Sequence, residues 1–287
     1  MTPGIVVSMA GGLGNQLFQY AAGRALSLRL GLPLTLDLSF FDRRRHRRYG
    51  LASLALAEHT VIAPPDGGLL QREMRQWTSS LKRRLGLSPR RYREPHFHFD
   101  HRFHEIREPV TLVGGYQSEK YFSDATDSIR SELTPPPAED ELSVRLAREM
   151  ASQPSCAVHV RRGDYISSEK NRSLYASCGI TYYSQAVESI PDDCTLYVFS
   201  DDMDWVRKHL HLRRPMVFVE SVEPRDVLAD LWLMSQAEHH IIANSTLSWW
   251  GAWLKTRAGL VCSPQHWFTA SSGMDDRDLV PSGWIRL

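Results

Sequence analysis

The sequence lacks the features that mark a disulfide-stapled, zinc-binding or membrane-spanning protein. Its four cysteines (Cys156, Cys178, Cys194 and Cys262) are scattered without CxxC spacing, which argues against a zinc site and against a compact disulfide framework. No apolar run is long enough to span a bilayer, and the amino terminus shows no charged leader or cleavage pattern. We therefore expect reduced thiols and a cytoplasmic location.

Excess charge is nearly absent as well. The chain has 34 Lys and Arg against 33 Asp and Glu, a formal net charge of +1, whereas nucleic-acid-binding domains are usually strongly basic. The basic run Arg43–Arg48 has no interleaved aromatic residues, so a solvated or acceptor-facing loop explains it better than a nucleic-acid contact. We expect no nucleic-acid partner, and peripheral membrane association through basic loops stays open.

Short β-branched runs alternate with amphipathic segments in the carboxyl half. The pattern predicts strands at 156–160, 195–199, 216–219, 240–243 and 259–263, and helices at 181–190, 203–212, 225–237 and 246–257. This alternation is typical of a doubly wound α/β sheet with parallel strands. The amino half starts similarly, with strands at 5–8, 34–38 and 110–113 and a helix at 16–30.

Three consecutive prolines, Pro135–Pro137, interrupt the pattern between the halves. They have no backbone N–H to donate in the hydrogen-bond ladder of a helix or strand. We therefore predict two domains, residues 1–140 and 141–287.

A glycine-rich loop follows the first predicted strand and opens a helix. Gly12, Gly14 and Asn15 lie where the backbone can approach a ligand closely and where free helical N–H groups face outward. The loop does not match GxGxxG, because Leu17 stands at the third glycine position. A ligand loop and a tight structural turn explain it equally well.

Two arginines, Arg161 and Arg162, follow the first strand of the carboxyl half, at the sheet edge where open α/β sheets bind ligands. A guanidinium can hold a diphosphate through paired hydrogen bonds without a metal. Arg161 is the leading candidate for stabilising a leaving group. The alternative is that one arginine pairs with Asp164 and the other is solvated.

The next strand ends in Ser200, Asp201 and Asp202, at the same edge. A carboxylate there can accept hydrogen bonds from the N1–H and amino edge of guanine. Asp202-Met203-Asp204 also resembles a DxD metal motif. Helix capping explains Asp204 better, because it falls in the first turn of the next helix.

A third strand end carries four polar residues: Asn244, Ser245, Thr246 and Ser248. The Ser and Thr hydroxyls and the N–H groups of the following helix form an anion cradle, although ordinary N-capping by Asn244 or Ser245 explains part of the pattern. The neighbouring Trp249, Trp250 and Trp253 fit the helix core better than a sugar platform. Together the three loops outline a nucleotide-diphosphate site.

Four histidines cluster in the amino half, at His96, His98, His101 and His104. A transition-metal site is one interpretation. Surface histidines or sugar contacts explain them better, because neither a cysteine nor an HExxH pattern accompanies them.

Five motifs, taken together, resemble the bacterial α-1,2-fucosyltransferases of glycosyltransferase family 11. They begin at Gly11, Gly115, His159, Phe199 and Asn244, and they run in family order across nearly the whole chain. The resemblance implies a GT-B fold, in which two Rossmann-like domains face a cleft. It also implies that the amino domain binds the acceptor, that the carboxyl domain binds GDP-fucose, and that no metal or other cofactor is required.

The resemblance further implies an inverting galactoside 2-α-L-fucosyltransferase, which moves L-fucose from GDP-β-L-fucose to the 2-hydroxyl of a terminal β-galactoside. Its expected catalytic residues are Arg161, Asn15 and Asp164. Its expected donor-binding residues are Gly12, Gly14, His159, Arg161, Ser200, Asp201, Asp202, Asn244, Ser245, Thr246 and Ser248. Gln16 is expected to approach the reacting sugar together with Gly14 and Asn15.

Several points stay open at this level. The catalytic base, the acceptor, the oligomeric state and the role of the histidine cluster are not identified. The rival hypotheses are a transferase making another linkage or using a GDP-mannose-type donor, a metal-dependent enzyme using Asp202 and Asp204, and a non-enzymatic binding module.

Overall fold

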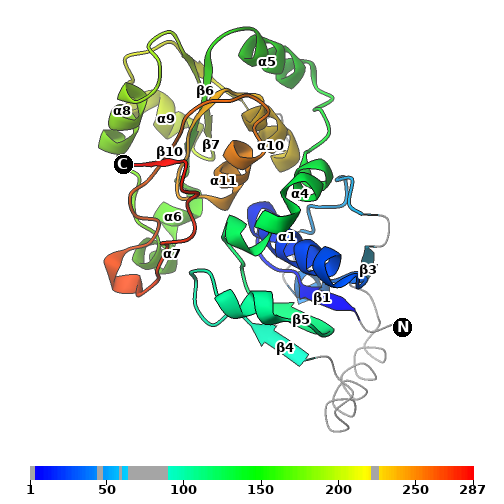
Figure 1. Ribbon diagram of the computed structural model, residues 1–287. Helices are drawn as coiled ribbons and strands as arrows, with labels where there is room; N and C mark the ends of the chain where they lie inside the picture. The colour runs from blue at the N-terminus through cyan, green and yellow to red at the C-terminus, as the bar shows by residue number, and fades with distance from the viewer. Residues whose placement is uncertain (1–3, 44–47, 58–59, 64–89, 221–225) are drawn as a thin grey trace. The chain divides into compact units, whose positions relative to one another are not determined.

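The structure, a computed structural model, describes residues 4–43, 48–57, 60–63, 90–220 and 226–287. The chain divides into two compact units, Met1–Glu132 and Leu133–Leu287, each with its own β-sheet (Figure 1). The division falls within helix α4 (Thr126–Leu133), about eight residues before the predicted boundary between residues 140 and 141.

The carboxyl unit contains a six-stranded sheet in the order β11-β10-β9-β6-β7-β8. Every neighbouring pair is parallel, which confirms the predicted α/β class with a parallel sheet. The strands are β6 (Ser155–Val160), β7 (Thr195–Ser200), β8 (Met216–Phe218), β9 (His239–Ile241), β10 (Val261–Ser263) and β11 (Ile285–Arg286).

Helices alternate with these strands along the chain. They are α5 (Glu141–Ser152), α6 (Gly163–Ser167), α7 (Glu169–Leu174), α8 (Ile180–Glu188), α9 (Met203–His209), α10 (Val227–Ser235) and α11 (Thr246–Trp253), with a 3-10 turn η4 (Ala270–Ser272). Four of them match predicted helices. The predicted helix 246–257 ends early, at Trp253, and the Thr256 N–H donates to the Ser235 carbonyl of α10 at 3.4 Å.

Both faces of this sheet are covered. Along β6, all six residues are buried: Cys156 and Val158 pack in a cluster with Tyr183 of α8, while Ala157 packs in a second cluster with Leu146 of α5. A parallel strand buried on both faces is continuously apolar rather than alternating. This burial explains why the central strands were recognisable in the sequence.

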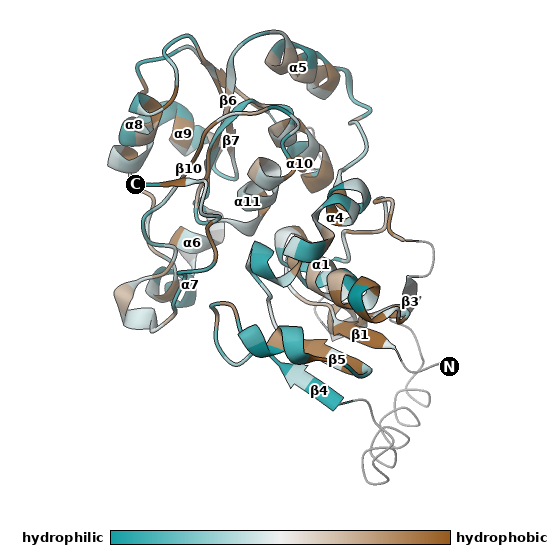
Figure 2. Cartoon of the chain, viewed as in Figure 1, coloured by the Kyte–Doolittle hydropathy of each residue, from teal (hydrophilic) through white to brown (hydrophobic). Residues whose placement is uncertain are grey.

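The amino unit contains a five-stranded sheet in the order β3-β2-β1-β5-β4, again with every pair parallel. Its strands are β1 (Ile5–Ser8), β2 (Leu34–Asp37), β3 (Val61–Ala63), β4 (Arg90–Arg93) and β5 (Val110–Val113). Strand β4 has the sequence RRYR and is hydrophilic where β1 and β5 are apolar (Figure 2). An arginine-rich edge strand gives no apolar pattern, so the sequence analysis did not find it.

The helical elements of this unit are α1 (Leu13–Leu30), α2 (Ser39–Arg43), the 3-10 turns η1 (His101–Glu105), η2 (Glu119–Tyr121) and η3 (Ser123–Ala125), and most of α4. Helix α1 begins one residue after Gly12, nearly a turn before its predicted start. It ends at Leu30, and the C-cap Gly31 has a φ of 63°, which lets its N–H donate to the Leu28 carbonyl. None of the described helices is long and apolar enough to cross a membrane.

Candidate active site

The strand order of the carboxyl unit reverses at its centre. From β6 the sheet continues through β7 to β8 on one side, and from the adjacent β9 it continues through β10 to β11 on the other. In open α/β sheets such a switch point leaves a crevice outside the carboxyl ends of the two central strands. The loops after β6 and β9, which carry two of the predicted motifs, therefore lie on either side of this switch point.

Asp201 fixes the loop that follows β6. Its Oδ2 accepts from Nη1 of Arg161 at 2.9 Å, and its Oδ1 accepts the backbone N–H of Arg162 at 2.8 Å. A Cβ on Gly163 would lie 2.4 Å from Oδ2 of Asp201, so only glycine allows this close approach. Asp201, which follows β7, thus holds the loop after β6 in place.

Asp202 performs a parallel task for the second arginine. Its Oδ2 accepts from Nε of Arg162 at 3.2 Å, and its Oδ1 accepts the Trp205 N–H at 3.2 Å, which caps α9. The Arg162 guanidinium also lies over the Trp205 ring, 3.6 Å from the centroid. Asp204 lies in the first turn of α9, as predicted, but the N-cap is Asp202 and not Asp204.

Each arginine therefore has a carboxylate partner from the end of β7. The side chains of Arg161 and Arg162 are 30% and 22% exposed, which leaves guanidinium surface available to an anion. The alternative in which one of them is simply solvated is wrong. Their suggested partner Asp164 begins α6 with Gly163, but its side chain lies outside the described part of the chain.

Two further predicted residues, His159 and Ser200, are buried in the strands themselves. The Ser200 hydroxyl donates to the Val160 carbonyl at 2.9 Å and accepts the Asp202 N–H at 3.0 Å. It therefore joins β6 to the turn after β7. Nucleotide contacts by His159 and Ser200 stay predictions.

The loop after β9 leads into α11. Ser245 is the N-cap, but its side chain makes no cap hydrogen bond, so the capping explanation fails for its hydroxyl. Asn244 and Ser248 are buried, and Ser248 bonds back to the Ser245 carbonyl at 3.2 Å. Thr246 is half-exposed and begins the helix, where the first N–H groups have no carbonyl partner within the helix.

The tryptophans of α11 belong to the core, as predicted. Trp249 and Trp250 are fully buried and Trp253 nearly so. The indole N–H of Trp249 donates to the Leu279 carbonyl at 2.9 Å, which satisfies the polar edge of the buried ring.

The glycine-rich loop lies at the carboxyl end of β1 in the amino unit. Gly11 has a φ of 84° and Gly12 is the N-cap of α1, which also contains the predicted Gly14. Gln16 is fully buried, and its amide bonds the carbonyls of Gly11 and Arg48 at 3.1 and 2.9 Å. The Gln16 side chain thus holds the loop together, and its approach to the sugar stays a prediction.

Asn15 meets a second loop of the same unit. Its Oδ1 accepts from the Gln117 amide at 3.3 Å. The Glu94 carboxylate accepts the N–H groups of Gly115 at 2.7 Å and of Tyr116 at 3.1 Å, and burial raises the pKa of Glu94. Tyr116 has a φ of 52°, uncommon for a bulky residue. The sequence analysis missed Glu94, which carries no motif of its own.

The histidine cluster shows no metal geometry. The rings of His96 and His98 stack, 3.6 Å between centroids, and Nδ1 of His96 lies 2.8 Å from the His98 carbonyl oxygen. Within the described residues, no group of three or more His, Cys, Asp or Glu side chains could hold a metal ion.

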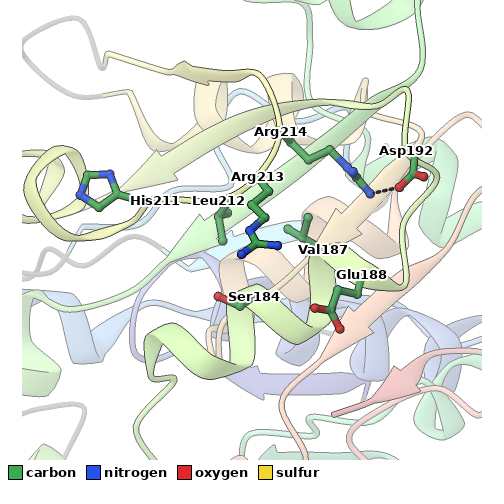
Figure 3. A pocket seen from close by; sticks show the side chains of 8 residues that line it. All are labelled: Ser184, Val187, Glu188, Asp192, His211, Leu212, Arg213 and Arg214. Carbon is green, nitrogen blue, oxygen red and sulfur yellow. Dashed lines mark hydrogen bonds and ion pairs between the residues drawn. The ribbon is translucent and has the colours of Figure 1, made fainter.

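A separate pocket lies near the amino ends of the strands in the carboxyl unit (Figure 3). Its lining includes Asp192, which precedes β7, and Arg214, which precedes β8 and pairs with Asp192. Because the strands are parallel, this pocket is at the opposite edge from Arg161. It contains none of the predicted site residues.

The known proteins that resemble this chain in sequence include several glycosyltransferases. An Escherichia coli alpha-1,2-colitosyltransferase is 30% identical over 99% of this chain and 98% of its own. The E. coli O-antigen biosynthesis glycosyltransferase WbnK is 30% identical over 97% of this chain and 99% of its own. A Caenorhabditis elegans galactoside 2-alpha-L-fucosyltransferase is 29% identical over 67% of this chain and 57% of its own.

Solved structures give a weaker likeness. Fucosyltransferase NodZ from Bradyrhizobium has 12% identity and a TM-score of 0.47, covering 88% of this chain and 93% of its own. The profile of glycosyl transferase family 11 matches residues 91–287, which include the arginine, aspartate and α11 motifs described above. The chain belongs to glycosyltransferase family 11.

Proposed function

We propose that the protein transfers L-fucose from GDP-β-L-fucose to the 2-hydroxyl of a terminal β-galactoside, with inversion, in the synthesis of a surface glycan or oligosaccharide. The observation that carries this proposal is the pair of carboxylate-held arginines beside a switch point. Membership of family 11 and the names of the relatives support it.

The proposed fucosyl transfer requires the site to stabilise the departing nucleotide. In a single in-line displacement, the acceptor oxygen bonds to C1 of the sugar as the bond from C1 to the β-phosphate oxygen breaks, and GDP leaves with an added negative charge. A guanidinium oriented before the reaction stabilises that charge without reorganising. Arg161 fits this role because Asp201 holds its guanidinium and because the side chain is 30% exposed, so that a β-phosphate can reach it.

The proton of the acceptor hydroxyl must leave in the same step or soon after. Asp164 and Asn15 are the proposed candidates for assisting it. Asn15 accepts a hydrogen bond from Gln117, which fixes its carbonyl oxygen, so its amide N–H₂ can orient a sugar hydroxyl. In this proposal Asn15 positions the acceptor and does not act as the base.

We further propose that no metal ion takes part. Asp202, which a DxD mechanism would use, already caps α9 and pairs with Arg162. In this account the arginines supply the positive charge that a metal would supply in a DxD enzyme. In the matching GT-B arrangement the amino unit binds the acceptor and the carboxyl unit binds GDP-fucose.

A second donor is favoured by one relative, the alpha-1,2-colitosyltransferase that matches nearly the whole chain. Colitose lacks the 3-hydroxyl of fucose. A site that hydrogen-bonds this hydroxyl rejects the deoxy sugar strongly, whereas an apolar site discriminates weakly between the two sugars.

The test is product analysis. The protein is incubated with GDP-fucose or GDP-colitose and a panel of β-galactosides, with and without EDTA, and the linkage of any product is determined by NMR. We expect an α-1,2-linked product whose yield EDTA does not change, with GDP-fucose as the better donor. A preference for GDP-colitose supports the second candidate. Another linkage, or loss of product in EDTA, contradicts the proposal.

A further inference from the structure

Tyr165 lies at a junction between the two loops that flank the switch point. It belongs to α6, directly after the arginine motif. Its hydroxyl donates to the main-chain carbonyl of Asn244, in the loop after β9, at 3.0 Å. Its ring stacks on Tyr175, with 4.3 Å between the centroids and 7° between the planes. One half-buried side chain therefore touches both loops.

The partners of Tyr165 are themselves anchored. Tyr175 forms an antiparallel bridge with Phe268, and their rings lie 5.6 Å apart. The Asn244 amide donates to the carbonyls of Ala176 at 2.5 Å and Trp267 at 3.1 Å, and the Ala176 N–H donates to the Trp267 carbonyl at 3.2 Å. These segments form one hydrogen-bonded block against which the Tyr165 ring rests.

The two arginines differ in how they meet aromatic rings. The Arg162 guanidinium lies 3.6 Å from the centroid of Trp205, and its Nε donates to Asp202 at 3.2 Å. Arg161 lies 5.6 Å from the centroid of Tyr165 and is the more exposed of the two. The Arg162 guanidinium is therefore packed in place, whereas the Arg161 guanidinium is bounded by Asp201 and the Tyr165 ring and keeps surface for a ligand.

We propose that Tyr165 is a positioning residue for the donor diphosphate. Its ring orients the Arg161 guanidinium, and its hydroxyl ties the arginine loop to the start of α11, so that both phosphate-binding groups keep a fixed separation. The inference rests on the proposed donor site. A long arginine side chain loses rotamer freedom when it binds, and orienting it beforehand reduces that cost.

The test compares the affinities of the full-length protein for GDP and GMP by isothermal titration calorimetry. Only GDP carries the β-phosphate that Arg161 is proposed to hold. Arg161→Ala should therefore lower the affinity for GDP by about ten- to a hundredfold and change the affinity for GMP little. Tyr165→Leu should weaken GDP by about three- to tenfold, again with little change for GMP. Tyr165→Phe keeps the ring but removes the hydrogen bond to the Asn244 carbonyl, so it should weaken GDP binding by only part of the amount lost in Tyr165→Leu.

A double-mutant cycle isolates the positioning effect. In the Arg161→Ala background, Tyr165→Leu should not change the GDP-to-GMP affinity ratio further, because the group it orients is gone. Tyr92→Leu, a half-buried tyrosine substitution in the amino unit, serves as the control and should leave both affinities unchanged.

The outcomes separate the inference from the function on which it rests. If Tyr165→Leu lowers the affinities for GDP and GMP equally, Tyr165 does not position Arg161. The same conclusion follows if Tyr165→Leu leaves the GDP affinity unchanged while Arg161→Ala lowers it. If the wild-type protein binds neither nucleotide, the proposed donor site fails first. If Tyr165→Leu does not fold, additivity of Tyr165→Phe with Arg161→Ala in the GDP-to-GMP ratio overturns the inference.

Discussion

At the scale of single residues, the candidate site depends on a glycine, Gly163, which has no side chain to displace its neighbour Asp201. Gly163 leaves room for Oδ2 of Asp201, which a Cβ would approach to 2.4 Å. Asp201 in turn holds both the Arg161 side chain and the Arg162 backbone. A change at the glycine therefore reaches the arginine that is proposed to bind the diphosphate.

Gly163→Ala should lower transferase turnover by about tenfold or more. The added Cβ forces Asp201 to shift and so displaces Arg161, which should raise the activation free energy by about 1 to 3 kcal/mol. Gly179→Ala is the matched control: this N-cap glycine has a φ of −76°, and an added Cβ there meets nothing within 4 Å. The initial rates of both variants test this prediction. A Gly163→Ala enzyme with normal rates would show that the Asp201–Arg161 ion pair is dispensable for turnover.

At the scale of secondary-structure elements, α1 is fastened to α4 by a buried ion pair. Nε of Arg24 donates to Glu132 at 2.9 Å, and the Tyr20 hydroxyl donates to the same carboxylate at 2.6 Å. The two charged side chains are only 8% and 11% exposed. Burial, and then the Glu132 carboxylate, raise the pKa of Tyr20, so the hydroxyl remains a donor.

Glu132→Ala should reduce the free energy of unfolding by about 3 to 5 kcal/mol, since it removes the carboxylate that compensates the buried Arg24 charge. Glu139→Ala, at an exposed position, should change it by less than about 0.5 kcal/mol. Urea denaturation followed by circular dichroism measures both. Equal, small effects would mean that the ion pair contributes nothing to holding the helices together.

Strand β9 carries a buried histidine that makes stability depend on pH. Burial lowers the pKa of His240 to about 3, although a hydrogen bond with the Met234 carbonyl opposes the shift. The folded protein keeps this imidazole neutral, while the unfolded chain takes up a proton below about pH 6.5. Its contribution to stability is therefore complete above that pH and is lost as the pH falls toward 3.

His240→Gln should remove this dependence. Between pH 7 and pH 5 the wild-type protein should lose about 2 kcal/mol more unfolding free energy than the variant, because only its unfolded state gains the proton. Urea titrations at the two pH values test this. If the two proteins lose stability in parallel, His240 is not the group responsible.

The sequence predicted elements well where burial is two-sided and poorly where it is not. Strands β6 and β7 and helix α8 agree with the predicted ranges to within a residue or two, because apolar periodicity records the burial directly. The edge strand β4 carries three arginines and leaves no such record. Glu94 was missed for a related reason: its role depends on backbone N–H groups of a distant loop.

At the scale of the whole molecule, the motif order and family were recognisable from the sequence, and so was the convergence of two arginines and two aspartates at one sheet edge. The partners within that cluster were not. Which carboxylate caps α9, and which holds each arginine, depends on side-chain geometry that spacing does not encode. The Asn244 amide bonds loop carbonyls, a role that the spacing of the motif did not indicate.

The central claim is that Arg161 stabilises departing GDP. The most direct measurement is the rate of GDP formation from GDP-fucose with a β-galactoside acceptor, in the wild type, in Arg161→Ala and in the control Arg145→Ala on the exposed face of α5. The account predicts a loss of about 10²- to 10³-fold for Arg161→Ala and none for the control. A wild-type rate in Arg161→Ala would contradict it.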